Sequence, residues 1–310
     1  MSNYHQESNL AIELLKNATK ITEWFRKEGF KSYQKQDDSP VTLADFTTQI
    51  YIISRIKELF PNDRIIAEES LIDSLDKNIE SQIRKCFQYL HIGEIDDLKE
   101  ALNYRGPNSN RQWTIDPIDG TKGYQEGLSY ATGIGFIDQS DLIMSVIGIP
   151  NYNEKGLAIF VAEKDQGAKA SYGNRNFIPI KVSKQKDLRS SKMCHSLHYD
   201  KPWVMKFAEI SGIKNLVQMD SMAKFCMVAD GSADLYIKPM SVTRSFIWDF
   251  LPGDLMVKEA GGIVTDLNLN FLKYKDEKCI ISSEGIVASN LILHDEILNI
   301  IKQHNLLETQ

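Results

Sequence analysis

The segment WTIDPIDGTKGY, residues 113–124, places Asp116 and Asp119 on either side of a Pro-Ile pair. Proline fixes its own φ angle and restricts the residue before it, so the segment is predicted to form a stiff turn rather than a helix. The residues that follow, Gly120 to Gly123, can present backbone N–H groups at the start of a helix, which is a natural anion site. Two carboxylates therefore precede a stretch suited to receive an anion.

Acidic residues also stand at the boundaries of other expected helices and strands, and no histidine or cysteine accompanies them at metal-ligand spacing. Ligand sets made of oxygen alone select hard cations, Mg²⁺ above all and also Mn²⁺ or Ca²⁺. The carbonyl group of Ile118, inside the predicted turn, is a further candidate ligand. The acidic positions are Asp45, Glu68 and Glu69, Asp116 and Asp119, and Asp249.

Cations held by these carboxylates, together with the backbone amides after Asp119, would bind a phosphate group. The reaction implied is hydrolysis of a phosphate monoester by metal-activated water. One alternative is the haloacid-dehalogenase type of phosphatase, in which the first aspartate of Asp-x-Asp-Gly-Thr becomes phosphorylated. Here the spacing is one residue longer, so Asp116 as a covalent nucleophile is the minor hypothesis.

Each of these residues also has a simpler interpretation when it is taken alone. Thr42 and Asp45 match a helix capping pair, and Asp249 could cap the helix that follows it. His195 and His198 could form a zinc pair, but they have no companions and lie in a polar stretch, so a substrate contact or a surface position is expected. Lys224 and Lys238 would each be interpreted as exposed charges. The acidic groups together favour the metal site.

The composition describes an acidic chain with ample material for a core. It has 310 residues, of which 42% are hydrophobic, and 36 basic against 42 acidic side chains give a net charge of −6. An acidic balance disfavours binding to nucleic acid and to anionic membranes. The four cysteines form no CxxC pair, and the polar N-terminus does not match a signal peptide. We therefore expect a cytoplasmic protein whose partner is a small molecule.

The pattern of apolar residues predicts alternating helices and strands. Strands are expected at 64–67, in a hairpin at 130–137 and 142–150, from 156, and near 234–239, 262–267 and 285–290. Residues 71–112 are expected to hold helical excursions and a Gly-Pro loop. Helices are expected at 10–25, 43–60 and 250–260. A mixture of this kind, with carboxylates at the ends of elements, fits a layered α/β or α+β enzyme.

Several motifs, in this order, resemble those of the inositol monophosphatase superfamily of Mg²⁺-dependent, lithium-sensitive phosphatases. They are PVTLADFTTQ, AEES, WTIDPIDGTKGY, IWDFLPGDLMVKEAGGIVTD and GIVASN, and the resemblance covers residues 8 to about 300. DGTKGY is similar to the 3'(2'),5'-bisphosphate nucleotidase branch, which typically carries DGTKGF. Inositol monophosphatases usually have Thr-Asn-Phe after Asp-Gly-Thr, and inositol polyphosphate 1-phosphatases usually replace the Gly with Ser. Two departures are Ala67, where Gly is common, and Tyr124 in place of Phe.

The resemblance implies a fold and a role for each candidate residue. The implied fold is a layered α/β/α/β/α sandwich, which we divide into residues 1–165, with most of the metal ligands, and residues 166–310, with Asp249 and the nucleotide contacts. Asp45 and Thr121 would activate water, and Gly120 and Thr121 would hold the scissile phosphate. The metal ligands, for about two or three Mg²⁺ ions, would be Glu68, Asp116, Ile118, Asp119 and Asp249. The nucleotide contacts would be His195, Ser221, Lys224 and Lys238.

The implied activity is Mg²⁺-dependent removal of the 3'-phosphate from adenosine 3',5'-bisphosphate, and from its 5'-phosphosulfate analogue, with a role in sulfur metabolism. Inhibition by Li⁺ is also implied. Hydrolysis of inositol phosphates, by an inositol monophosphatase or an inositol polyphosphate 1-phosphatase activity, is the alternative within the superfamily. A non-catalytic metal or anion sensor is the alternative from another class, which the complete set of acidic ligands disfavours.

Overall fold

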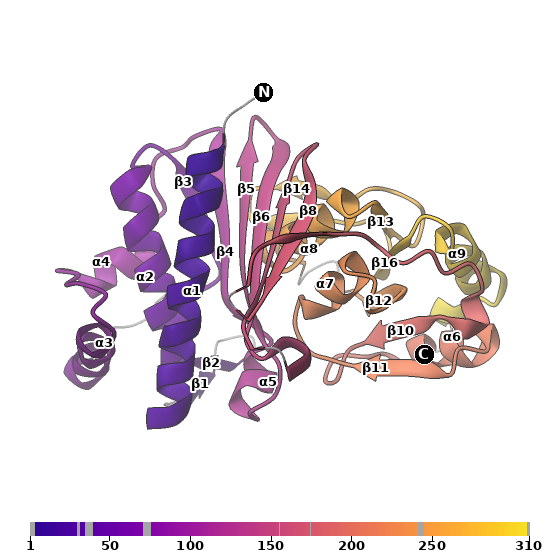
Figure 1. Cartoon of the computed structure of the whole chain (residues 1–310), viewed down its shortest axis with the longest axis horizontal. Helices are drawn as coiled ribbons and strands as arrows, with labels where there is room; N and C mark the ends of the chain where they lie inside the picture. Colours follow the sequence, from indigo (N-terminus) through magenta and orange to yellow (C-terminus); the bar gives the residue numbers. More distant parts are fainter. Residues whose placement is uncertain are drawn as a thin grey trace.

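The computed structural model describes residues 4–29, 32–34, 40–70, 76–154, 156–173, 175–240 and 245–308. In this part of the chain two large β-sheets alternate with three layers of helices (Figure 1). The α/β/α/β/α order expected from the sequence is therefore confirmed. No helix within the described ranges combines the length and the apolar character that a membrane crossing requires.

Two long helices form the first layer, at the left of Figure 1: α1 (His5–Glu28) and α2 (Leu43–Leu59). In α1 the apolar residues recur every three or four positions, and this face is buried against α2 and the first sheet. The shorter helices α3 (Lys77–Leu90) and α4 (Leu98–Asn103) lie on the outer side of α1 and α2. They match the helical excursions expected for 71–112, of which 71–75 lie outside the described residues.

The first sheet has seven strands, and all of its neighbouring pairs are antiparallel except β3–β4. The expected hairpin is formed by β5 and β6, whose turn residues Gln139 and Ser140 both have positive φ angles, as a two-residue hairpin turn requires. The strands, in spatial order, are β3 (Arg64–Ala67), β4 (Arg111–Asp119), β5 (Ala131–Asp138), β6 (Asp141–Ile149), β7 (Ala158–Glu163), β8 (Gly167–Tyr172) and β9 (Ile178–Ile180).

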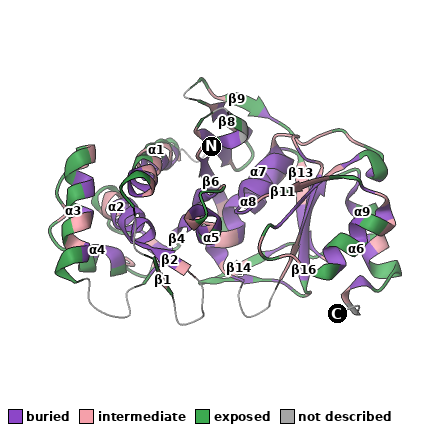
Figure 2. Cartoon of the chain, turned by 90° about the horizontal axis from the view of Figure 1, so that it is seen from below, coloured by how far each residue is buried: buried purple, intermediate pink, exposed green. Residues whose placement is uncertain are grey.

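Two helices fill the space between the sheets, α7 (Ala223–Ala229) and α8 (Ile247–Glu259). The helix α8 packs on the face of the first sheet opposite α1, and it also contacts the second sheet. Most of its residues are consequently buried, and Figure 2 shows it as an almost continuous purple ribbon. It begins three residues before the expected start at 250, so that Asp249 lies in its first turn.

The second sheet has five strands, and the helices α6 (Pro202–Ser211) and α9 (His294–Gln303) cover its outer face. Its strands, in spatial order, are β11 (Asn215–Gln218), β10 (Lys192–His195), β12 (Leu235–Pro239), β16 (Gly285–Asn290) and β13 (Gly262–Asp266). Two small antiparallel pairs complete the strands: β1 (Ser32–Gln34) with β2 (Pro40–Thr42), and β14 (Lys273–Lys275) with β15 (Lys278–Ile280). Short α5 (Thr121–Gln125) and 3₁₀ turns at Tyr152–Glu154, Leu188–Ser190 and Leu306–Glu308 complete the described helices.

The prediction of a stiff turn at 113–124 is wrong for the first half of this segment. The strand β4 continues through Asp119, and its pairing with β5 shifts register between Asp116 and Asp119. A shift of this kind accommodates Pro117, which has no N–H group to donate to the ladder. The division of the chain after residue 165 falls between β7 and β8 of one sheet, whereas the change of sheet falls between Ile180 and Lys192.

We predict that acid destabilises the fold partly through His294, at the start of α9. Its two ring nitrogens lie 2.8 Å from the hydroxyl groups of Thr265 and Ser289, and burial lowers the pKa of the imidazole from 6.5 to about 4. Between pH 6.5 and pH 4, His294 is therefore mostly protonated in the unfolded chain and mostly neutral in the folded chain. The free energy of unfolding should fall by about 2 kcal/mol between pH 7 and pH 5 through this group.

Urea unfolding of the wild-type chain and of His294→Gln at both pH values tests this prediction. The variant is expected to be less stable at pH 7 but to lose less stability on acidification. Equal losses in the two proteins would contradict the assignment.

Candidate active site

A pocket of about 320 Å³ lies where the ends of β3 and β4 meet the first turn of α8. Residues from the first sheet, α5, β12 and the turn before α7 all contribute to its lining. Its volume is in the range of small-molecule sites.

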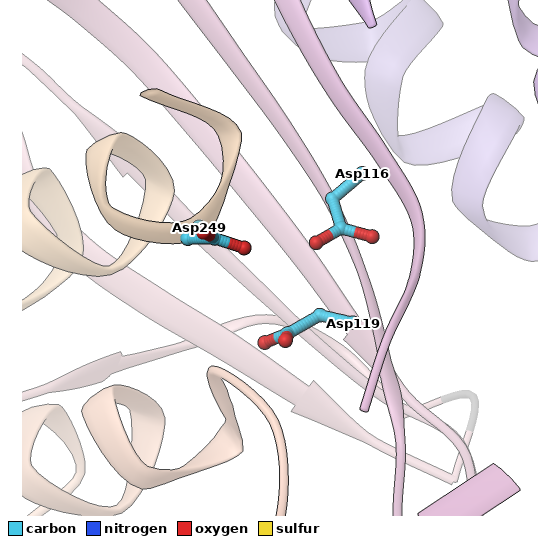
Figure 3. Close-up of side chains that lie close together, drawn as sticks. All are labelled: Asp116, Asp119 and Asp249. Atoms are coloured by element: carbon cyan, nitrogen blue, oxygen red, sulfur yellow. The ribbon is translucent and has the colours of Figure 1, made fainter. Parts of the chain in front are cut away.

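Three aspartates converge at the base of this pocket. Asp116 and Asp119 come from the bulged end of β4, and Asp249 comes from the first turn of α8, with the side chains pointing toward one another (Figure 3). Each offers one carboxylate oxygen within 4.8 Å of the others. The structure thus brings Asp249 close to Asp119, which lies 130 positions earlier in the chain (249 − 119).

Glu68 joins this group because β3 and β4 run parallel. The register pairs Ala67 with Ile115, and the Glu68 N–H continues the ladder by donating to the Ile115 carbonyl at 3.1 Å. Glu68 consequently stands beside Asp116. The neighbouring backbone is fixed by the Gln49 side chain, whose amide group accepts from the Glu69 N–H at 2.8 Å and donates to the Glu69 carbonyl at 2.7 Å. The buried Glu69 therefore belongs to the framework that holds Glu68 in place.

The cluster concentrates negative charge in a buried place. Burial, followed by the charges of Glu68, Asp119 and Asp249, raises the pKa of Asp116 well above its usual value. Burial also raises the pKa of Asp119, although the ammonium groups of Lys238 and Lys224 act in the opposite direction. The pKa of Asp249 rises to about 7, again chiefly by burial. These carboxylates disfavour one another's ionised form, and the two lysines do not fully offset the rise in the pKa of Asp119.

The residues present fit a hard divalent cation. Oxygen Oδ1 of Asp116 is buried and has no hydrogen-bond partner among the described residues, although buried carboxylate oxygens are normally paired. A cation would bind this oxygen and stabilise the ionised carboxylates around it. The donor set consists of oxygen atoms alone, which selects Mg²⁺ or a similar ion. An acidic cluster with an unpaired oxygen is thus a candidate magnesium centre.

The two carboxylate oxygens of Asp45 make different contacts, one with Thr42 and the other with Thr121. Its Oδ2 accepts from the Thr42 N–H at 2.8 Å and from the Thr42 hydroxyl at 2.6 Å, in a capping box that begins α2. Its Oδ1 lies 3.4 Å from the hydroxyl oxygen of Thr121, which itself donates to the Ile118 carbonyl at 3.0 Å. The capping interpretation is therefore correct, and it leaves Oδ1 facing Thr121.

Gly120 begins α5 in a conformation that other residues rarely adopt. Its φ and ψ angles of 85° and 41° are left-handed, and a Cβ atom at this position would lie 3.2 Å from the Cβ of Ser221. The helix is anchored at its other side by Tyr124, whose hydroxyl group donates to the Thr22 carbonyl of α1 at 2.7 Å. The tyrosine that replaces the usual phenylalanine thus adds a hydrogen bond between α5 and the first layer.

Lys224 and Lys238 approach the acidic cluster from the second half of the chain. The interpretation of Lys224 as an exposed charge is wrong, because only 3% of it is exposed and its ammonium group donates to the Met219 carbonyl at 2.8 Å. Burial lowers the pKa of Lys224 to about 8, against the opposing effect of Asp119. Lys238, on β12, is half-buried, with its ammonium group 4.4 Å from the centre of the Phe250 ring.

The expectation that His195 and His198 lie in a polar loop is wrong for His195. His195 is the last residue of the buried strand β10, and its Nδ1 lies 2.6 Å from Oδ2 of Asp200. His198 follows the strand and lies between two carboxylates, with Nδ1 2.5 Å from Asp220 and Nε2 3.0 Å from Glu126. Both rings thus have carboxylate partners, and zinc ligation by the pair finds no support in these contacts.

In the turn before α7, the sequence analysis named Ser221 but not its neighbours Asp220 and Met222, which also line the pocket. Ser221 has a φ angle of 71°, and the next residue, Met222, donates its N–H to a carboxylate oxygen of Asp119. Asp220 packs against α5, where a side chain at Gly123 would lie 2.8 Å from its Oδ2. No local spacing indicates the contacts of Asp220 and Met222, because they link segments about a hundred residues apart.

A family model described as "Inositol monophosphatase family" matches residues 3–306. The chain belongs to the inositol monophosphatase family. It is 29% identical to the 3'(2'),5'-bisphosphate nucleotidase of Schizosaccharomyces pombe, over 95% of this chain and 94% of that protein. It is 33% identical to the 3'(2'),5'-bisphosphate nucleotidase of Dictyostelium discoideum, over 87% of each.

A solved structure, the IMPase of Thermotoga maritima, superimposes with a TM-score of 0.71 at 21% identity and covers 98% of both chains. This likeness supports the family fold. The protein is accordingly a phosphatase, a hydrolase of phosphate esters. Enzymes of the inositol monophosphatase family are generally Mg²⁺-dependent, and the acidic cluster provides carboxylates that could bind the ion.

We predict that Asp116→Asn stabilises the protein in the absence of divalent cations and removes its stabilisation by Mg²⁺. The substitution removes one buried ionisable carboxyl group from the cluster, so the metal-free variant should unfold at a temperature a few degrees higher, equivalent to about 1–2 kcal/mol. Addition of Mg²⁺ should raise the melting temperature of the wild-type chain alone.

Asp254→Asn is the matched control, because Asp254 is also buried on α8 but is bound by Lys258 and Tyr274. That variant should be less stable and should keep the Mg²⁺ response. Differential scanning calorimetry measures both effects. A Mg²⁺ response that survives in Asp116→Asn would contradict the assignment of the metal centre.

Proposed function

We propose that the protein removes the 3'-phosphate from adenosine 3',5'-bisphosphate in a Mg²⁺-dependent reaction and releases AMP and phosphate. The observation that carries this proposal is the presence, in one pocket, of an acidic cluster and of two lysines that face it from the second half of the chain. The curated relatives, which are 3'(2'),5'-bisphosphate nucleotidases over nearly the whole chain, support the choice of substrate.

A substrate with two phosphate groups needs two anion sites, and the pocket has the charges for both. The acidic cluster with its cations and the N–H groups at the start of α5 would bind the phosphate that is removed. Lys224 and Lys238 would bind the other phosphate, with Ser221 and His195 as hydrogen-bonding neighbours. Both lysines line the same pocket as the cluster, and their charges act to lower the pKa of Asp119. Although the protein is acidic overall, the positive charge of these two lysines would attract an anionic substrate to the pocket.

The metal would be held by Glu68, Asp116, Asp119, Asp249 and the Ile118 carbonyl, at about two or three positions. When bound, Mg²⁺ supplies Lewis-acid activation of water and neutralises charge on the phosphate. A small monovalent ion such as Li⁺ can occupy a site made of hard oxygen ligands without supplying the same charge, so Li⁺ inhibition forms part of the proposal.

Asp45 and Thr121 would move the proton of the attacking water. The hydroxyl group of Thr121 receives this proton while its own passes to Oδ1 of Asp45, which lies 3.4 Å away. The water oxygen forms a bond to phosphorus as the bond from phosphorus to the ribose 3'-oxygen breaks, and the ribose oxygen takes a proton from solvent. Because Thr42 fixes Oδ2 of Asp45, the base is held in one orientation before substrate binds.

Phosphate release from a panel of phosphomonoesters tests the proposed function. We expect Mg²⁺-dependent turnover of adenosine 3',5'-bisphosphate, with AMP as the nucleotide product by chromatography, and much slower turnover of inositol 1-phosphate and of AMP. Turnover of inositol 1-phosphate without turnover of the nucleotide would contradict the proposal and favour the inositol phosphatase alternative. A protein that binds Mg²⁺ but hydrolyses no member of the panel would be a sensor.

Replacement of Asp45 by Asn should lower kcat by about 10²–10⁴-fold and leave the affinity for AMP nearly unchanged. An asparagine side chain can still accept the capping bond from Thr42, so α2 should be retained, whereas the amide cannot take a proton. Steady-state kinetics and AMP titration measure the two effects. If Asp45→Asn turned over at the wild-type rate, the residue would be a helix cap alone.

Lys238→Ala should raise KM for adenosine 3',5'-bisphosphate by roughly tenfold or more and change kcat far less, because a charged hydrogen bond shared by ground and transition states is lost. Turnover of adenosine 3'-monophosphate, which lacks the second phosphate, should be little affected. Lys273→Ala, an exposed lysine on β14, is the matched control. Equal losses on both substrates would mean that Lys238 supports the metal centre and does not bind the second phosphate.

A further inference from the structure

We infer that Tyr199 is a specificity-determining residue that stacks on the planar base of the substrate. The inference rests on the proposed function, since it assigns a contact within the same pocket. Tyr199 lies on the segment after β10 and contributes to the pocket lining. Tyr199 is 62% exposed, and its ring lies edge-on to the ring of His198, with the two centroids 6.3 Å apart.

The other aromatic rings of the pocket are not available for this role. Phe225, Tyr236, Trp248 and Phe250 are all buried, with at most 6% of their surface exposed. Phe246 is half-buried and stacks on Trp248 with an interplanar angle of 3°, and the ammonium group of Lys278 lies 4.0 Å from the centre of its ring. Among the described residues that line the pocket, Tyr199 is therefore the one aromatic residue with most of its surface open.

Hydrogen bonds on both sides fasten the segment that carries Tyr199. On one side the Asp200 carboxylate lies 2.6 Å from the His195 ring and accepts from the Ser196 N–H at 3.0 Å. The Tyr199 N–H donates to the Ser196 hydroxyl at 3.2 Å. These bonds tie Tyr199 and Asp200 back to the end of β10 and so close a short loop.

His198 attaches the other side of this loop to two different parts of the pocket wall. Its ring contacts Asp220, before α7, and Glu126, at the end of α5. A tyrosine on a loose surface loop would lose entropy on stacking, whereas this loop is already tied to the walls that hold the phosphates. The backbone of Tyr199 is thus held in place before a ligand arrives.

An exposed ring at the mouth of a phosphate pocket suits one class of ligand group. A flat nucleobase can stack on a tyrosine, and base–aromatic stacking strengthens binding by about 5- to 100-fold per base. The puckered, hydroxyl-rich ring of an inositol phosphate gains little from the same surface. Tyr199 would therefore favour nucleotides over other phosphomonoesters without contacting the phosphate that is removed.

Isothermal titration in the presence of Mg²⁺ with AMP and with ribose 5-phosphate, which carries the same phosphate but no base, tests this inference. For Tyr199→Ala the affinity for AMP should fall by about 5- to 100-fold and that for ribose 5-phosphate should stay within about twofold of the wild-type value. Tyr199→Phe should bind AMP as the wild type does. Tyr89→Ala, which removes a 69% exposed tyrosine on α3, is the control and should change neither affinity.

Equal weakening of both ligands in Tyr199→Ala would show that the residue only supports the loop, and unchanged affinity for AMP would show that it makes no contact; either result overturns the inference. Failure of the inference can be told from failure of the proposed function. If the wild type does not hydrolyse adenosine 3',5'-bisphosphate but its AMP affinity depends on Tyr199, the inference stands without the function. If it does hydrolyse this substrate and Tyr199→Ala binds AMP normally, only the function stands.

Discussion

The mutual repulsion of buried carboxylates is the constraint on which the rest of this structure depends. Oxygen atoms of Asp116, Asp119 and Asp249 lie within 4.8 Å of one another, and Glu68 stands beside them. At the effective dielectric constant of a protein, two like charges at this separation repel by about 3–4 kcal/mol. The cluster therefore costs free energy on folding, and a cation bound between the carboxylates would offset that cost.

The fold places the cluster by joining elements that are rigid for other reasons. The parallel pairing of β3 and β4 puts Glu68 next to Asp116, and the register shift in β4 turns Asp119 toward the same point. The helix α8 brings Asp249 because it is packed between the two sheets. The second half of the chain then adds the positive charge of Lys224 and Lys238. Residues from both halves of the chain therefore line the pocket.

Local patterns in the sequence predicted the parts of the site that depend on short spacing. Asp116 and Asp119 stand in one motif, and the capping pair of Thr42 and Asp45 follows from three residues of separation. The apolar spacing of α1 and α2 and the hairpin of β5 and β6 were predictable for the same reason. The length of β4 was not predicted, because Pro117 indicates a turn unless the pairing with β5 is known to contain a bulge.

Contacts between distant segments account for what the sequence did not reveal. The burial of Lys224 and the position of His195 depend on β10, a short strand that pairs in parallel with β11 and β12 and has no alternating pattern of its own. The links from His198 to Glu126 and Asp220 join residues 72 and 22 positions apart. No local spacing indicates such partners, and Tyr199 in isolation is an ordinary surface tyrosine.

The most direct test of the central claim is an anomalous difference map from crystals grown with Mn²⁺, a hard cation that scatters anomalously and can replace Mg²⁺. The account predicts strong peaks between the carboxylates of Glu68, Asp116, Asp119 and Asp249, within about 2.5 Å of their oxygen atoms. A map with no peak at this cluster at millimolar Mn²⁺, or with peaks only elsewhere on the protein, would contradict it.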